Sequence, residues 1–183
     1  MQSVYSTECI ARNLDKTVTN VVKLLKANGL TIATAESCTG GLLSERITSV
    51  SGASEVFELG ICSYSCRIKS EILGVDAAAI EKYGVVSSET ALGMVRGLKK
   101  ASSADVCVSV TGIAGPSGGT PEQPVGTVYI GFDICGKRFV KLPKLWELND
   151  ATRERIRLSA AVFAFETIEK HLTEANHSDE RQL

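Results

Sequence analysis

The chain has 183 residues, of which 44% are hydrophobic and 22% are charged, and its formal net charge is -1. These values are typical of one globular domain, and they exclude a general electrostatic attraction to nucleic acid or to an anionic membrane. No apolar run approaches the roughly 20 residues that a membrane-spanning helix needs. Residues 1–5 do not begin a signal peptide, so we expect a cytoplasmic protein without membrane or nucleic-acid partners.

Hydrophobic spacing and turn residues predict alternating helices and strands over residues 14–172. The expected helices are residues 14–28, 42–47, 69–73, 77–83, a longer helix that Ser87 caps, and 152–172. The expected strands are residues 30–33, 57–64, 105–110, 125–132 and 137–145, of which the last two form a hairpin. This order predicts a single α/β domain, a three-layer α/β/α sandwich with a mixed, mostly parallel sheet of about five strands, between loose termini at 1–13 and 173–183.

Histidine is scarce in this chain, since only His171 and His177 occur and both lie near the C-terminal end. A histidine-ligated metal centre and a Ser-His or Cys-His pair are therefore disfavoured. The six cysteines are scattered and include no Cys-x-x-Cys pair, so neither a zinc site nor a disulfide framework has support. We expect no metal and no cofactor.

The stretch Thr34–Gly41 is the strongest candidate for chemistry. It follows a short apolar strand, precedes a helix, and combines a carboxylate, hydroxyls, a thiol and two glycines. In α/β proteins such turns hold reactive side chains and ligands, because glycine admits a ligand to the backbone and helix N–H groups face it. Ser37 is either the N-cap of the following helix or a nucleophile, and Cys38 is the rival nucleophile.

A nucleophilic Ser37 needs a base, and the scarcity of histidine leaves lysine as the candidate. A lysine accepts a proton only if burial or nearby positive charge lowers its pKa from about 10.4 toward neutrality. Lys69 suits this role because it follows the strand that ends at Tyr64–Ser65, so both groups would lie at one edge of the sheet. The alternative is an ordinary solvated lysine.

A Gly- and Pro-rich stretch, Thr111–Pro121, is too irregular for a helix or strand and long enough to suggest a function. It is either a long connection or a loop whose N–H groups bind a phosphate or carboxylate. Arg153 and Arg157 lie four residues apart near the start of the last helix. They either form ion pairs with acidic neighbours, or one of them grips a ligand phosphate.

Together these segments resemble the CinA C-terminal domain family of competence/damage-inducible proteins, over about residues 14–172. The matching motifs are Ala33–Gly41, Tyr64–Ser65 with Lys69, Ile72–Val75, Gly84–Ser87, Val110–Gly119 and Pro124–Val128. Active members are nicotinamide-nucleotide amidases, so the resemblance implies hydrolysis of nicotinamide mononucleotide to nicotinic acid mononucleotide and ammonia. The N-terminal domain of many members lies outside the resemblance, and no pyrophosphatase activity is expected. Small enzymes of this kind often dimerise, so we expect a homodimer or higher homo-oligomer.

The resemblance also implies roles for individual residues. Ser37 would be the nucleophile and Lys69 the base, with Tyr64 and Thr111 beside them, while Arg153 would bind the phosphate. The other expected substrate-binding residues are Glu36, Thr39, Gly40, Gly41, Cys66, Gly112, Gly115 and Gly118. We further infer that N–H groups around Thr39–Gly41 hold the oxyanion.

Two positions differ from the family pattern. Cys66 stands where members usually carry Asn, and Ala151–Thr152 stands where they usually carry Gly-Asp. A thiol does not supply the paired donor and acceptor of an amide. These differences motivate an alternative hypothesis, a catalytically weakened or inactive CinA-like domain that binds a nucleotide-type ligand in a regulatory role.

Overall fold

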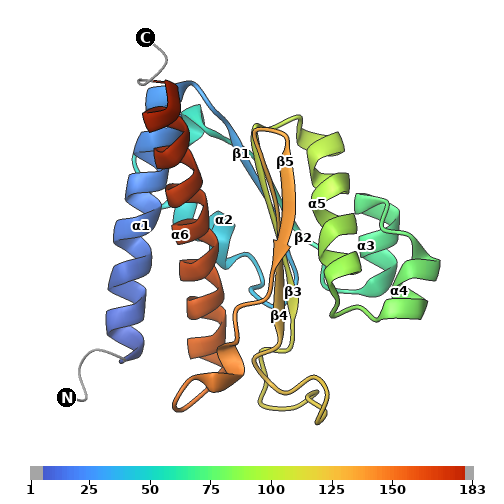
Figure 1. Ribbon diagram of the computed structural model, residues 1–183. Helices are drawn as coiled ribbons and strands as arrows, with labels where there is room; N and C mark the ends of the chain where they lie inside the picture. Colours follow the sequence, from blue (N-terminus) through green and yellow to red (C-terminus); the bar gives the residue numbers. More distant parts are fainter. Residues whose placement is uncertain (1–5, 180–183) are drawn as a thin grey trace.

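The computed structural model describes the backbone of residues 6–179 and the side chains through residue 174. Its α-helices are α1 (Thr7–Asn28), α2 (Leu42–Thr48), α3 (Cys66–Leu73), α4 (Ala77–Tyr83), α5 (Ser88–Ser102) and α6 (Arg153–Asp179). Its strands are β1 (Ile32–Glu36), β2 (Phe57–Cys62), β3 (Val106–Gly112), β4 (Val128–Ile134) and β5 (Lys137–Lys141). Helices α1, α2 and α6 cover one face of the sheet and α3, α4 and α5 the other, which confirms the expected three-layer sandwich (Figure 1).

Within the described residues the five strands form one sheet in the order β2-β1-β3-β4-β5. Strand β1 pairs in parallel with β2 and β3, whereas β4 pairs antiparallel with β3 and β5. Strand β4 therefore runs opposite to the others, and the sheet is mixed and mostly parallel, as predicted. Glu36 is in register with Cys62 and Val110. The residues that follow these three, Ser37 and Ser63 among them, consequently gather at one edge of the sheet.

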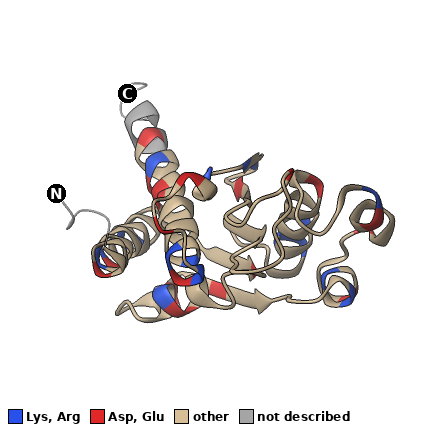
Figure 2. Ribbon diagram, turned by 90° about the horizontal axis from the view of Figure 1, so that it is seen from below, with Lys and Arg blue, Asp and Glu red and all other residues tan. Residues whose placement is uncertain are grey.

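Apolar side chains on both faces of the sheet explain why the layers pack. Every residue of β1 is buried, as expected for a central parallel strand covered by helices on both sides. Leu14 of α1 and Phe165 of α6 are fully buried in the layer on one face, and Met94 and Leu98 of α5 in the layer on the other. Acidic and basic positions are interspersed over the surfaces of the helices (Figure 2).

Several boundaries differ from those predicted. Helix α1 begins at Thr7, because the Ser6 hydroxyl caps it by accepting a hydrogen bond from the N–H of Cys9 at 3.2 Å. Helix α6 continues to Asp179, so residues 7–13 and 173–179 are helical instead of loose. The rest of the expected loose termini, residues 1–5 and 180–183, lies outside the described residues.

Two shifts of this kind change how the site is built. Strand β1 extends through Glu36, which places Ser37 immediately after the strand. Helix α3 begins at Cys66 because Ser65 caps it, accepting from the N–H of Ile68 at 3.3 Å. Lys69 therefore lies inside the helix, three residues after its start, and not at its first residue as predicted. The hairpin is shorter than predicted, since β4 begins at Val128 and β5 ends at Lys141.

Candidate active site

Ser37 and Lys69 lie side by side at the edge of the sheet where β1 ends. The Nζ atom of Lys69 is 3.0 Å from Oγ of Ser37. Ser37 is held by its backbone, because its N–H donates to the carbonyl oxygen of Val110 at 3.0 Å. The sequence prediction that these two side chains meet agrees with this geometry.

Close packing of α3 against α5 fixes the helix that carries Lys69. Gly97 of α5 permits this contact, because a Cβ atom there would lie only 1.7 Å from the carbonyl oxygen of Leu73, the last residue of α3. A side chain at this position would push α3 away from α5, and Lys69 with it. The close approach therefore contributes to the position of the lysine.

The Lys69 side chain is fully buried. Burial lowers the pKa of its amine below the ordinary value of 10.5, and the thiols of Cys66, Cys38 and Cys62 oppose this shift to a smaller extent. Its Nζ donates to the carbonyl oxygen of Ser63 at 2.7 Å and lies 3.5 Å from that of Tyr64. A neutral amine has two hydrogens for these two carbonyls and one lone pair for the hydroxyl of Ser37. The arrangement thus suits a lysine that accepts a proton.

The Glu36 carboxylate caps the N-terminal end of helix α2, so the hydroxyl of Ser37 is not needed as a cap. The residue at the N-cap position is Gly41, and the fully buried Glu36 carboxylate accepts from its N–H at 3.0 Å. The same carboxylate accepts from the N–H of Leu43 at 3.1 Å and from the N–H and hydroxyl of Ser44, each at 2.9 Å. The geometry therefore assigns Glu36 to the helix instead of to a substrate.

The expected oxyanion donors need a similar correction. The N–H of Gly40 donates to the carbonyl oxygen of Ser37 at 3.1 Å, and that of Gly41 is bound to Glu36. Both groups are used within the turn because it closes tightly on itself, with φ of 62° at Gly40 and 93° at Gly41. Within the range Thr39–Gly41, only the N–H of Thr39 is left by these contacts.

A cavity of about 260 Å³ opens beside the Ser37–Lys69 pair. Its lining residues are Ser37, Cys38, Tyr64, Ser65, Cys66, Val85, Val86, Thr111, Gly112, Ala114 and Arg153. Arg153 is the one charged side chain among these described residues, and Val85, Val86 and Ala114 supply apolar walls. The cavity therefore combines a serine hydroxyl, an apolar wall and a positive charge.

Arg153, in the first turn of α6, lines this cavity. Its Nη1 donates to the carbonyl oxygen of Gly115 at 2.8 Å, and its Nη2 donates to the hydroxyl of Tyr64 at 3.2 Å. Thr111 supports the wall, because its hydroxyl donates to the carbonyl oxygen of Val85 at 2.8 Å. The guanidinium retains further N–H groups for an anion.

Comparison with known proteins agrees with the motifs. The family model described as the CinA C-terminal domain matches residues 14–172. The chain belongs to this family. It is 48% identical to a CinA-like protein of Kosmotoga olearia over 152 residues, 83% of this chain and 36% of the relative. It is 44% identical to a CinA-like protein of Thermotoga maritima over 180 residues, 92% of this chain and 43% of the relative. The chain thus spans about two fifths of the length of these curated relatives.

Solved structures of the CinA family share the fold. A competence/damage inducible protein of Agrobacterium tumefaciens is 34% identical, with a TM-score of 0.82 over 88% of this chain and 96% of that one. A CinA superfamily protein of Klebsiella pneumoniae is 26% identical, also with a TM-score of 0.82, over 88% of this chain and 98% of that one. These likenesses cover nearly the whole described fold.

The two cysteines of the cavity differ in their surroundings. Burial raises the pKa of the Cys38 thiol to about 12, and the neighbouring Glu36 carboxylate adds to this effect. Cys38 is therefore protonated at neutral pH and is a poor rival to Ser37 as a nucleophile. Cys66, one of the two positions at which the sequence differs from the expected family pattern, is exposed in the first turn of α3 and lines the cavity.

The remaining residues that the CinA resemblance indicated are placed in different ways. Gly112 lines the cavity, and Gly115 contributes its carbonyl to Arg153. Thr39, Gly40, Gly41 and Gly118 are not among the lining residues, and Gly118 is exposed on the Gly- and Pro-rich loop.

Sequence reasoning missed three contributors to the site. Ser63 acts through its carbonyl group, and Val85 and Val86 act as walls. Every residue has a backbone carbonyl, so the sequence does not show which carbonyl will accept a hydrogen bond. A pair of valines that lines a cavity cannot be distinguished in the sequence from a pair in the core. These roles were therefore not available from the motifs.

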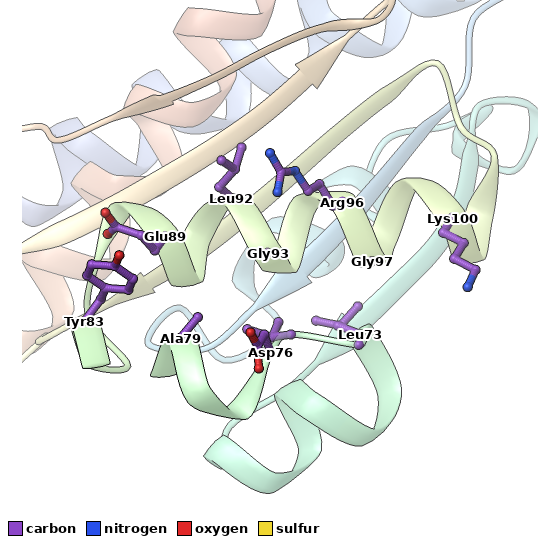
Figure 3. Close-up of a pocket in the computed structure, with 12 residues that line it drawn as sticks. Leu73, Asp76, Ala79, Tyr83, Glu89, Leu92, Gly93, Arg96, Gly97 and Lys100 are labelled. Atoms are coloured by element: carbon purple, nitrogen blue, oxygen red, sulfur yellow. The ribbon is translucent and has the colours of Figure 1, made fainter. Parts of the chain in front are cut away.

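A separate hollow of about 480 Å³ lies between α5 and the α3–α4 segment (Figure 3). Its lining residues on α5 include Glu89, Gly93, Arg96 and Gly97. None of the expected site residues is among its described lining residues. Over the described part of the chain, no group of three His, Cys, Asp or Glu residues is arranged to hold a metal, and no helix has the length and apolarity to cross a membrane.

Proposed function

We propose that this CinA-family chain is an amidohydrolase that converts nicotinamide mononucleotide to nicotinic acid mononucleotide and ammonia. The observation that carries this proposal is the contact between Ser37 and the buried amine of Lys69, at 3.0 Å. A serine beside a lysine of lowered pKa is the arrangement that a Ser-Lys mechanism requires. The family membership and the motifs around both residues support the same activity.

The chemistry follows from this pair. Lys69 takes the proton of the Ser37 hydroxyl while Oγ attacks the amide carbon of the substrate. The C–N bond then breaks, ammonia leaves with the proton returned by Lys69, and an acyl-enzyme ester forms on Ser37. Water attacks the ester, Lys69 again carries the proton, and the free acid and the serine hydroxyl result. The N–H groups of Cys38 and Thr39 are the candidate donors to the oxyanion.

The cavity also fits the substrate class. Arg153 offers N–H groups to a phosphate, for which arginine is well suited because its donors form a planar fork. Val85 and Val86 provide an apolar wall against which a pyridine ring can lie. These features support a small substrate that carries a phosphate group and an amide-bearing ring. Nicotinamide mononucleotide has both of these groups.

The test is release of ammonia from nicotinamide mononucleotide by the purified chain. Wild-type protein should release ammonia, and a Ser37→Ala variant should not exceed the buffer background. A Ser54→Ala variant, whose serine is exposed outside the cavity, is the matched control and should retain wild-type turnover. Equal rates for wild type and Ser37→Ala would reject the proposal.

Cys66 favours a second candidate function, a regulatory domain that binds a mononucleotide without turning it over. An exposed thiol lines the cavity where the family usually carries an amide. In this case the mononucleotide should raise the melting temperature of the protein while no ammonia appears. Activity gained in a Cys66→Asn variant would identify an enzyme weakened by this one substitution.

A further inference from the structure

Arg157 contacts the backbone of the turn that follows the nucleophile. It lies on α6, one helical turn after Arg153. Its Nη2 donates to the carbonyl oxygen of Thr39 at 2.6 Å, and its Nε donates to the same oxygen at 3.2 Å. The side chain that the sequence offered as a possible phosphate ligand is therefore engaged with the protein.

The carbonyl of Thr39 has little other support. Its other donor in the turn is the N–H of Leu42 at 3.4 Å, which is long for a hydrogen bond. A charged guanidinium at 2.6 Å is a much stronger partner, because hydrogen bonds to charged groups are roughly twice as strong as neutral ones. Arg157 is thus the principal anchor of this carbonyl group.

The turn needs such an anchor because its backbone is intrinsically soft. Gly40 and Gly41 follow Thr39 directly, and glycine has the widest conformational freedom of all residues. The Glu36 carboxylate fixes the far end of the turn through the N–H of Gly41. Arg157, on α6, fixes the carbonyl of Thr39, the residue before the two glycines.

We propose that Arg157 is a positioning residue that holds the Ser37 turn against α6. The inference rests on the proposed function, and it adds how the Ser37 turn is held in position relative to the rest of that site. Arg153 and Arg157 are four residues apart on the helix, about 6 Å along its axis. Because a single rigid helix carries both residues, the nucleophile is held at a fixed place relative to the residue proposed to bind the phosphate.

Loss of the contact between Arg157 and Thr39 should lower the rate of the chemical step more than the affinity for substrate. A misplacement of about 1 Å can lower a rate by about 10²-fold. We therefore expect Arg157→Ala to lower kcat by about 10²-fold, with KM within threefold of wild type, because Arg153 and the cavity walls remain. Arg157→Lys keeps the positive charge but loses the planar pair of N–H donors. Its kcat should therefore lie between those of wild type and Arg157→Ala.

Arg155 offers a matched control on the same helix, since it is buried and forms an ion pair with Asp150 at 3.2 Å, away from the turn. Arg155→Lys should keep wild-type kcat. Methylguanidinium added to Arg157→Ala should restore part of its kcat, and it should restore none in Ser37→Ala. A rise in KM with unchanged kcat in Arg157→Lys would instead indicate a substrate-binding arginine and would overturn the proposal.

A second measurement separates this inference from the proposed function. The rate at which a small fluorophosphonate labels Ser37, followed by mass spectrometry, reports the nucleophile without the substrate. Labelling should slow in Arg157→Ala and Arg157→Lys but not in Arg155→Lys, even if wild type does not hydrolyse the mononucleotide. If Arg157→Ala does not fold, Arg157→Lys provides the comparison. Equal labelling in folded Arg157 variants and wild type, or no labelling of wild type, would overturn the inference.

Discussion

The amine of Lys69 is anchored to the carbonyl oxygen of Ser63 at 2.7 Å, six residues earlier in the chain. Ser63 is fully buried directly after β2, so this bond ties the lysine to the end of a strand. The amine is thereby held beside Ser37, and the lysine side chain is fully buried. Both properties, position and burial, have consequences that can be measured.

Replacing Lys69 by Arg should remove the proton acceptor. A guanidinium stays protonated at any pH that the protein tolerates, so it cannot take the proton of Ser37. We expect kcat to fall by about 10²–10⁴-fold, the usual contribution of a general base. Lys99→Arg is the control, because Lys99 also donates to a backbone carbonyl, that of Ala104 at 2.7 Å, but lies on α5 outside the cavity. Steady-state ammonia release measures both variants.

The pH dependence of kcat/KM should show a rising limb that belongs to Lys69. The protonated ammonium has no lone pair, so activity is absent at low pH and appears as the pH rises through the lysine pKa. Burial lowers this pKa below 10.5, so the limb should lie below that pH. A rate profile between pH 5 and 10 checks this, and a limb centred at the ordinary lysine pKa would contradict a buried base.

Substitution of Arg153 should discriminate between substrates with and without a phosphate. Loss of a charge-assisted hydrogen bond corresponds to about 1.5–3 kcal/mol, so Arg153→Ala should raise KM for the mononucleotide by about 10- to 100-fold. KM for the corresponding riboside, which has no phosphate, should change little. If both substrates lose affinity equally, Arg153 acts by holding Gly115 and Tyr64 in place and not by binding phosphate.

Alkylation should distinguish the two cysteines of the cavity. Iodoacetamide reacts with the thiolate, and Cys38 is buried with its pKa raised to about 12, whereas Cys66 is exposed. In the folded protein we expect a label on Cys66 and none on Cys38, together with loss of turnover because the adduct occupies the cavity. Peptide mass spectrometry locates the label. A Cys66→Ser variant treated in the same way should keep its own activity.

Glu36→Gln should destabilise the fold. The carboxylate accepts four hydrogen bonds at the start of α2, and an amide would turn a donor toward N–H groups. We expect a loss of about 1.5–3 kcal/mol in the free energy of unfolding, measured by urea denaturation. Glu45→Gln, on the exposed side of α2, is the control and should change stability by less than about 0.5 kcal/mol. Equal midpoints for the two variants would refute a structural role for Glu36.

The sequence predicted the layered α/β fold because its apolar periodicity alternates between strand and helix along the chain. It also placed Ser37 after a strand, and the scarcity of histidine left lysine as the candidate base. The resemblance to the CinA family then singled out Lys69. It did not predict the extent of α3, because the capping hydroxyl of Ser65 moves the start of that helix back by three residues. Glu36 was expected to face a substrate, because nothing in a linear motif shows which group a carboxylate will meet.

The sequence by itself determined which chemical groups this chain possesses: a serine, a lysine and two arginines in recognisable surroundings, with almost no histidine. Only the tertiary structure decided what each group does. Lys69 is buried because α3 packs closely on α5, and burial is what lowers its pKa. Arg153 and Arg157 have the same side chain and lie on one helix, yet one faces the cavity and the other holds Thr39. The residues that surround these two arginines come from distant parts of the chain. The type of a residue does not show which distant residues it will contact after folding.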